Sequence, residues 1–258
     1  MKQTRRRTLL VLCVLCVSAV STFAQSRPYL LHLPGIGGHM VIDDLLTQGL
    51  AQGKLDAEIE IYDWTGGNPG LAALVNLERN ETEAKVIADK ITRLVRANPS
   101  RRFILTSHSG GGGMAIFALE KLPDDVHIDT LLMLANALSP QYDLTKALRH
   151  VNGKVYVFTS ELDPVLGPGT RNFGTMDRVM SESAGRVGFT RPEGADPYQY
   201  DKIVSIPYDE SWMRFGNAGE HIGTMNRPFA RNILAPLLRT GQLPKVVAVT
   251  QPATTPVR

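Results

Sequence analysis

A serine stands between a stretch typical of a buried strand and a run of four glycines. Residues 105–114 have the sequence LTSHSGGGGM, which places Ser109 on a sharp turn between a strand and a helix. Such a turn lifts the serine hydroxyl above the sheet and needs small residues two positions before and after it. Ser107 and Gly111 occupy these positions. The pattern indicates a nucleophilic serine, and a plain glycine-rich loop after a strand is the alternative.

Two further side chains can complete this chemistry. A serine hydroxyl is a weak nucleophile at neutral pH and needs a base, which in turn needs an orienting acid. His221 lies in the Gly-bounded segment 217–223, after the other histidines in the chain. Asp163 follows a predicted strand and precedes a proline, a position that an ordinary turn residue also favours. Glu161 and Asp209 are the rival acids.

A second glycine-rich loop follows the first predicted strand. Residues 33–39 have the sequence LPGIGGH, and glycines allow backbone N–H groups of such a loop to approach a developing oxyanion closely. A dinucleotide-binding loop is the alternative, but Met40 stands where the third glycine of that motif belongs. A P-loop is excluded at 110–113, because no lysine follows these glycines.

Together these segments resemble the α/β-hydrolase superfamily, in its serine esterase and lipase-like form without a large cap. The resemblance extends over most of residues 28–240 and rests on the order serine, acid, histidine along the chain. It implies a catalytic triad of Ser109, Asp163 and His221. It also implies an oxyanion hole formed by the backbone N–H groups of Ile36 and Gly110.

Strand-like and helix-like segments alternate along the chain, which predicts an α/β fold. We expect a single-domain, α/β-hydrolase-like structure, with a mostly parallel sheet and helices on both of its faces. The carboxyl ends of the strands then meet at one edge, where ligands bind in such sheets. The predicted strands are 29–33, 58–64, 102–107, 128–135, 154–159 and 202–207, and the predicted helices are 39–52, 81–97, 113–122, 142–150, 170–183 and 221–238.

The segment between the fourth and fifth predicted strands has room for one short helix only. We therefore expect a fairly open site, with a rim formed by residues 65–76, 166–173 and 210–218. Four aromatic side chains are candidates for apolar contacts with a substrate, although packing in the core or rim is the favoured interpretation for each of them. They are Tyr62, Trp64, Phe173 and Trp212.

The charge distribution excludes several classes of function. The chain has 258 residues and a formal charge of +3, but Lys2, Arg5, Arg6 and Arg7 precede an apolar stretch in a segment without acids. No basic run or mixture of basic and aromatic residues follows, so we expect no nucleic-acid partner. No histidine motif or carboxylate cluster suggests a metal, and no cofactor is expected.

Residues 1–24 have the layout of a secretory signal peptide. A basic start precedes an apolar run from about residue 9 to residue 20, which is short for a membrane span. We expect cleavage after Ala24 and export to the periplasm or the extracellular space, with no stable membrane span after processing. An uncleaved signal anchor is the alternative. Cys13 and Cys16 both lie in this run, so the processed chain has no cysteine.

The sequence thus predicts a signal peptide at 1–24, an α/β-hydrolase domain at 25–241 and a flexible tail at 242–258. The leading hypothesis is an exported serine hydrolase that cleaves small-molecule or lipid esters through an acyl-enzyme on Ser109. A peptidase, amidase or acyltransferase would use the same triad. A non-catalytic binding protein that keeps the fold is the hypothesis from another class.

Overall fold

Apolar strands form a sheet that is buried on both faces. The computed structural model describes residues 26–245, so the predicted signal peptide 1–24 and most of the predicted tail lie outside the described residues. Within that range six strands pair in parallel, in the order β2-β1-β3-β4-β5-β6. The strands are β1 (Tyr29–Leu33), β2 (Glu58–Ile61), β3 (Phe103–His108), β4 (Thr130–Leu134), β5 (Val155–Thr159) and β6 (Ile203–Pro207).

Successive strand residues point to opposite faces, which divides the core into two layers. In β4, Leu131 and Met133 pack into one apolar cluster, whereas Leu132 and Leu134 pack into the other. The same alternation in β1, β3 and β5 explains why apolar residues occupy consecutive positions in these strands, as at 29–31, 103–105 and 155–158.

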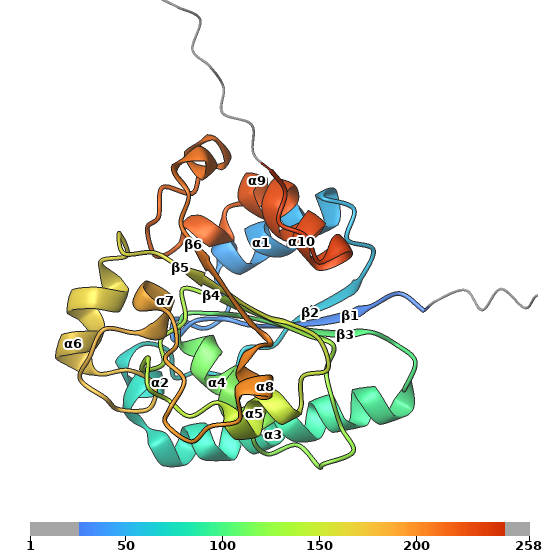
Figure 1. The fold of residues 1–258 in the computed structure, drawn as a ribbon, viewed down its shortest axis with the longest axis horizontal. Helices are drawn as coiled ribbons and strands as arrows, with labels where there is room; N and C mark the ends of the chain where they lie inside the picture. The colour runs from blue at the N-terminus through green and yellow to red at the C-terminus, as the bar shows by residue number, and fades with distance from the viewer. Residues whose placement is uncertain (1–25, 246–258) are drawn as a thin grey trace, which may run out of the picture.

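Helices cover both faces of the sheet (Figure 1). Helix α1 lies with the C-terminal helices on one face, and α3, α4 and α5 lie on the other. The helices are α1 (Val41–Gln52), α2 (Leu71–Val75), α3 (Leu77–Ala97), α4 (Gly110–Leu119), α5 (Thr145–Arg149), α6 (Thr170–Phe173), α7 (Ala184–Val187), α8 (Pro197–Tyr200), α9 (Arg227–Phe229) and α10 (Ala235–Thr240), with the short helices η1 (Val165–Gly169), η2 (Glu210–Phe215), η3 (Gly223–Met225) and η4 (Ala230–Leu234).

Local chemistry moves several boundaries away from their predicted positions. Helix α3 begins at Leu77 rather than at residue 81, because the Asn76 side chain accepts a hydrogen bond from the Arg79 N–H at 3.0 Å and caps the helix. The predicted helix at 221–238 is wrong in its first turn. His221 lies in a turn, and Pro228 stands in the first turn of α9 instead of interrupting a longer helix.

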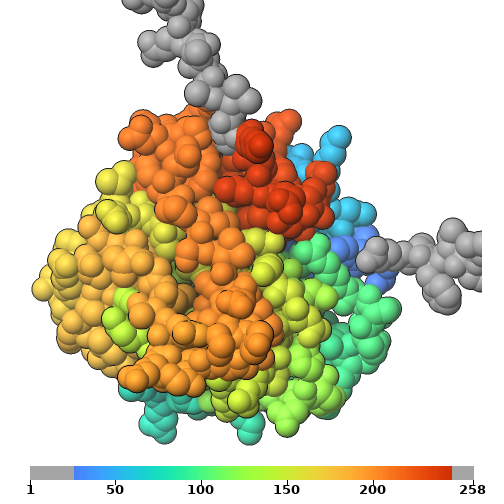
Figure 2. Space-filling model, in the orientation of Figure 1, coloured from blue at the N-terminus to red at the C-terminus, as the bar shows by residue number. Residues whose placement is uncertain are grey.

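The predicted helix at 170–183 is also wrong. Helix α6 stops after Phe173, because Gly174 adopts a φ of +82°, which ends a helix. The chain then stays irregular until α7. One short helix, α5, lies between β4 and β5 as expected, but the longer segment 160–202 joins β5 to β6. Figure 2 shows this segment, in gold and orange, spread over much of the visible face.

The first turn of α4 passes very close to the end of β1. A β-carbon on Gly111 would lie 2.3 Å from the Leu33 carbonyl oxygen and 2.4 Å from that of Pro34. Both neighbours are backbone atoms, so they cannot swing aside. Gly112 is confined in the same way, 2.1 Å from the side-chain oxygen of Asn136. The glycine run therefore lets a helix start directly beneath the loop that follows β1.

Replacing Gly111 by alanine is expected to lower the free energy of unfolding by about 1–3 kcal/mol, because the added methyl group overpacks the crossing with β1. Urea unfolding followed by circular dichroism measures this. Gly169→Ala is the matched control, since its β-carbon would meet only Val165 Cγ1 at an ordinary 3.7 Å. Equal unfolding midpoints for the two variants would show that the contact between α4 and β1 can accommodate a methyl group.

Candidate active site

Ser109 sits on a strained turn at the carboxyl end of β3, in the middle of the sheet. Its φ of 51° and ψ of −121° lie in a region that residues with a side chain rarely adopt. Its N–H donates to the Leu134 carbonyl oxygen at 2.9 Å, and its own carbonyl oxygen accepts from Gly112 and Ala137. These bonds to the neighbouring strand end and to α4 hold the turn in place.

The structure brings Ser109, His221 and Asp163 together from the ends of three strands. His221 Nε2 lies 3.0 Å from Ser109 Oγ, and His221 Nδ1 lies 2.8 Å from Asp163 Oδ2. Because an ionised carboxylate only accepts hydrogen bonds, Nδ1–H is the donor to Asp163. Nε2 of the neutral ring then accepts from the serine hydroxyl. This tautomer lets His221 take the proton of Ser109.

Asp163 is held rigidly in its position. Its side chain is almost fully buried, and its Oδ1 accepts hydrogen bonds from the N–H groups of Val165 and Leu166 at 2.8 and 3.0 Å. The rival acids lie elsewhere. Glu161 is exposed, and Asp209 accepts from the Ser211 N–H at the start of η2. Hydrogen bonds from the Ser211 side chain and then from its N–H lower the pKa of Asp209. The geometry therefore favours Asp163 over both.

Ile36 and Gly110, the two predicted oxyanion-hole residues, lie close to each other beside Ser109. The Ile36 nitrogen is 3.5 Å from the position that a β-carbon on Gly110 would take. Gly110 is the first residue of α4, so its N–H has no partner inside the helix. Within residues 26–245 neither N–H donates to another protein group. Two donors in this position can bind an oxygen that gains negative charge.

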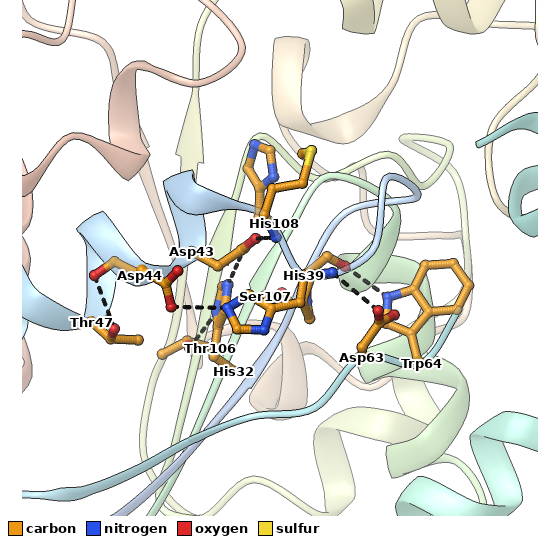
Figure 3. Close-up of polar contacts among 12 residues, drawn as sticks. His32, His39, Asp43, Asp44, Thr47, Asp63, Trp64, Thr106, Ser107 and His108 are labelled. Atoms are coloured by element: carbon orange, nitrogen blue, oxygen red, sulfur yellow. Dashed lines mark hydrogen bonds and ion pairs between the residues drawn. The ribbon is translucent and has the colours of Figure 1, made fainter. Parts of the chain in front are cut away.

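The loop that carries Ile36 is anchored on both sides (Figure 3). On one side, Trp64 Nε1 donates to the Pro34 carbonyl oxygen at 2.7 Å, and Asp63 accepts from the His39 N–H. On the other side, Asp43 accepts from the Met40 N–H at 2.8 Å. The Met40–Asp43 hydrogen bond therefore fixes the end of the loop to the first turn of α1.

Asp43 belongs to a buried polar network that the sequence analysis missed. His32, in β1, places Nε2 2.9 Å from Asp43 Oδ1 and Nδ1 2.9 Å from Thr106 Oγ1, with all three side chains buried. The signal was present in the sequence, as a histidine inside an apolar strand and an aspartate in the first turn of an amphipathic helix.

Asp43→Ala is expected to lower the free energy of unfolding by about 3–5 kcal/mol, because it leaves the buried His32 ring without its carboxylate partner. Asp44→Ala is the matched control on the next residue. Asp44 also pairs with a histidine, His39, at 2.9 Å, but this pair is exposed and is worth about 0–1 kcal/mol. Thermal and urea unfolding distinguish the two. Similar losses in both variants would contradict a structural role of the buried pair.

A second buried histidine lies against His221. The rings of His108 and His221 are 5.0 Å apart, and His108 Nε2 lies 3.0 Å from the His221 carbonyl oxygen. His108 Nδ1 has no partner among the described residues. Burial, followed by the nearby charge of His221, lowers the pKa of His108 to about 3. A neutral His108 therefore donates Nε2–H to the backbone of His221 and holds it beside Ser109.

The lowered pKa of His108 predicts a specific acid sensitivity. An unfolded histidine binds a proton near pH 6.5, but folded His108 does so only near pH 3. Between these values the unfolded state binds more protons, so stability falls as the pH decreases from about 6.5 towards 3. His108→Gln should reduce this loss, which urea unfolding at pH 7 and pH 4.5 measures. If the difference in the free energy of unfolding between pH 7 and pH 4.5 is the same in His108→Gln as in wild type, His108 does not contribute to the acid sensitivity.

A cavity of about 310 Å³ opens beside Ser109. Its wall combines Ile36, Leu71 and Leu74 with Leu166 and Phe173, so two of the three predicted rim segments border it. Of the four candidate aromatic contacts, only Phe173 lines this cavity. Trp64 and Trp212 are buried in the core clusters, and Tyr62 packs against one of them. The segment 210–218 borders a separate, smaller cavity behind Asp163.

Within residues 26–245, no group of three or more histidine, cysteine or acidic side chains is arranged to hold a metal ion. Among the same residues, none of the helices is both long and apolar enough to cross a membrane.

Solved structures provide the comparisons for this chain. Aspergillus fumigatus lipase B matches 88% of it with 11% identity and a TM-score of 0.52, and 56% of the lipase chain is covered. A predicted CIB-like hydrolase from Thermoplasma acidophilum matches 84% of this chain and 88% of its own, with 17% identity and a TM-score of 0.48. Est1E from Butyrivibrio proteoclasticus matches 85% of this chain and 90% of its own, with 11% identity and a TM-score of 0.46.

No protein-family model matches the sequence, and no curated protein matches it either. The likeness to the lipase shows a shared fold. Together with the parallel sheet and its two helical layers, it confirms the single-domain α/β-hydrolase fold that the sequence predicts.

Proposed function

We propose that this α/β-hydrolase-fold protein is an exported serine hydrolase that cleaves carboxylic esters through an acyl-enzyme on Ser109. The observation that carries the proposal is the continuous hydrogen-bond chain from Ser109 through His221 to Asp163. Two unpaired N–H groups and an uncharged cavity beside the serine support it. The reaction in this form needs no metal and no cofactor.

In the proposed acylation step each group has one role. Ser109 Oγ attacks the ester carbonyl carbon while His221 Nε2 takes the hydroxyl proton. The carbonyl oxygen becomes an oxyanion, which accepts hydrogen bonds from the N–H groups of Ile36 and Gly110. The C–O bond to the alcohol then breaks, and His221 returns the proton to the departing oxygen. Ser109 is left as an acyl ester.

Water completes the cycle by the same steps. His221 takes a proton from the water as its oxygen attacks the acyl carbon, and then gives that proton to Ser109 Oγ as the acid departs. Asp163 holds the ring in the required tautomer and stabilises the imidazolium. Each backbone donor in such an oxyanion hole contributes about 3 kcal/mol to the barrier reduction.

Export is the second part of the proposal. It rests on the basic start and the short apolar run in residues 1–24, which are typical of a cleaved secretory signal. The protein would then act on small-molecule or lipid esters in the periplasm or outside the cell.

Ser109→Ala is expected to lower kcat/KM for p-nitrophenyl esters by at least about 10³-fold, because no other group supplies the attacking oxygen. The matched control is Ser205→Ala, on the exposed edge strand β6, which should keep wild-type activity. Full activity in Ser109→Ala would refute the proposed nucleophile. Circular dichroism of both variants verifies that the fold is intact.

Reaction with an organophosphonate separates the competing functions. Stoichiometric labelling of wild type at Ser109, together with ester turnover, supports the esterase. Labelling with faster turnover of amides, or with acyl transfer to an added alcohol, would favour a peptidase, amidase or acyltransferase with the same triad. Neither labelling nor turnover would favour a non-catalytic binding protein.

A further inference from the structure

We infer that the cavity beside Ser109 is the acyl subsite, and that it selects aliphatic acyl groups of about six to ten carbons. The inference rests on the proposed function and adds the substrate class. Three independent features of the described residues carry it, namely the side of Ser109 on which the cavity lies, its chemistry and its size.

The position of His221 determines which part of an ester enters the cavity. The departing alcohol oxygen must receive its proton from His221 Nε2, so the alcohol lies on the His221 side of Ser109. Ser109 and Ile36 both line the cavity, but His221 does not. The cavity therefore borders Ser109 and Ile36 but not the proton donor His221, which makes it the place for the acyl chain.

The chemistry of the wall fits a hydrocarbon chain. None of the residues that line the cavity is charged. Its inner part is formed by the buried side chains of Leu74, Ala137 and Leu166. The polar group of Thr170 is engaged elsewhere, since Oγ1 donates to the Leu166 carbonyl oxygen at 2.9 Å. A charged or strongly polar acyl group would lose hydration here without gaining a partner.

The mouth of the cavity is apolar as well. Leu71 is 53% exposed and Phe173 is 56% exposed, and they border the opening from α2 and α6. Large apolar side chains left in water at the mouth of a pocket mark a surface that a ligand covers. An acyl chain that fills the inner part therefore continues along apolar surface as it leaves.

The volume limits the length of the chain. The cavity has about 310 Å³, which is at the small end of the range for ligand pockets. A water-sized group occupies roughly 30 Å³, so the cavity holds at most about ten such groups. Each methylene that enters should raise kcat/KM about fourfold, and the gain should stop once the cavity is full.

The test compares chain-length profiles of p-nitrophenyl esters from acetate to myristate. Wild type should have its optimum at about six to ten carbons, as the volume of the cavity requires. Leu74→Ala enlarges the inner end and should move the optimum to longer chains. Gly169→Leu should move it to shorter chains, because a β-carbon at Gly169 meets only Val165 Cγ1 at 3.7 Å and the added side chain has room beside the cavity. Tyr198→Ala, at a side chain that is 80% exposed, is the control and should leave the profile unchanged.

A second series holds the acyl group constant and varies the alcohol. Opposite shifts of the acyl optimum in the two variants, with an unchanged alcohol preference, support the acyl subsite. Unshifted acyl profiles, or a change in alcohol preference instead, would overturn the inference and leave the esterase intact. If wild type cleaves no ester of either series, the proposed function fails, and the inference fails with it.

Discussion

The turn at Ser109 depends on space that only glycine leaves. The backbone of α4 begins within contact distance of the carbonyl groups at the end of β1, and a single methyl group on Gly111 would overlap them. Two features of the site lie at this crossing. The serine at this crossing has a strained backbone conformation, and the first residue of α4, Gly110, lies close to Ile36. The proposed nucleophile and its two proposed backbone donors therefore share one packing constraint.

Buried polar side chains keep this arrangement rigid. His32 and Asp43 connect β1 to the start of α1. His108, the residue before Ser109, bonds to the backbone of His221. Each buried ring or carboxylate is desolvated and is held by at least one hydrogen bond, although His108 Nδ1 has no partner among the described residues. The loop after β1 and the loop after β6 thus have little freedom to move relative to the serine. Such a fixed geometry is what proton transfer between Ser109 and His221 requires.

Much of this could be predicted from the sequence, because the rules involved are local. Alternating apolar segments indicated a parallel sheet, and the strand ends of such a sheet must meet, which is why Ser109, Asp163 and His221 were expected to lie together. The contacts of His32 and His108 were not predicted, because neither histidine belongs to a motif that identifies its partner, and the partners are 11 and 113 residues away in the chain. The prediction of a helix at 170–183 failed because Gly174 adopts a positive φ and because the Met176 N–H bonds to the distant Ala137 carbonyl oxygen instead of within a helix.

The sheet order gives the three proposed catalytic residues unequal mechanical support. Ser109 follows a central strand with partners on both sides, whereas His221 follows β6, which lies at the edge and pairs only with β5. Most of β6 is only partly buried, so it can open at a lower free-energy cost than the centre of the sheet. Local fraying of this strand would displace the proposed base, His221, while the turn at Ser109 stays folded. The protein would then lose its proposed activity through partial opening at one edge of the sheet, well before its core unfolds.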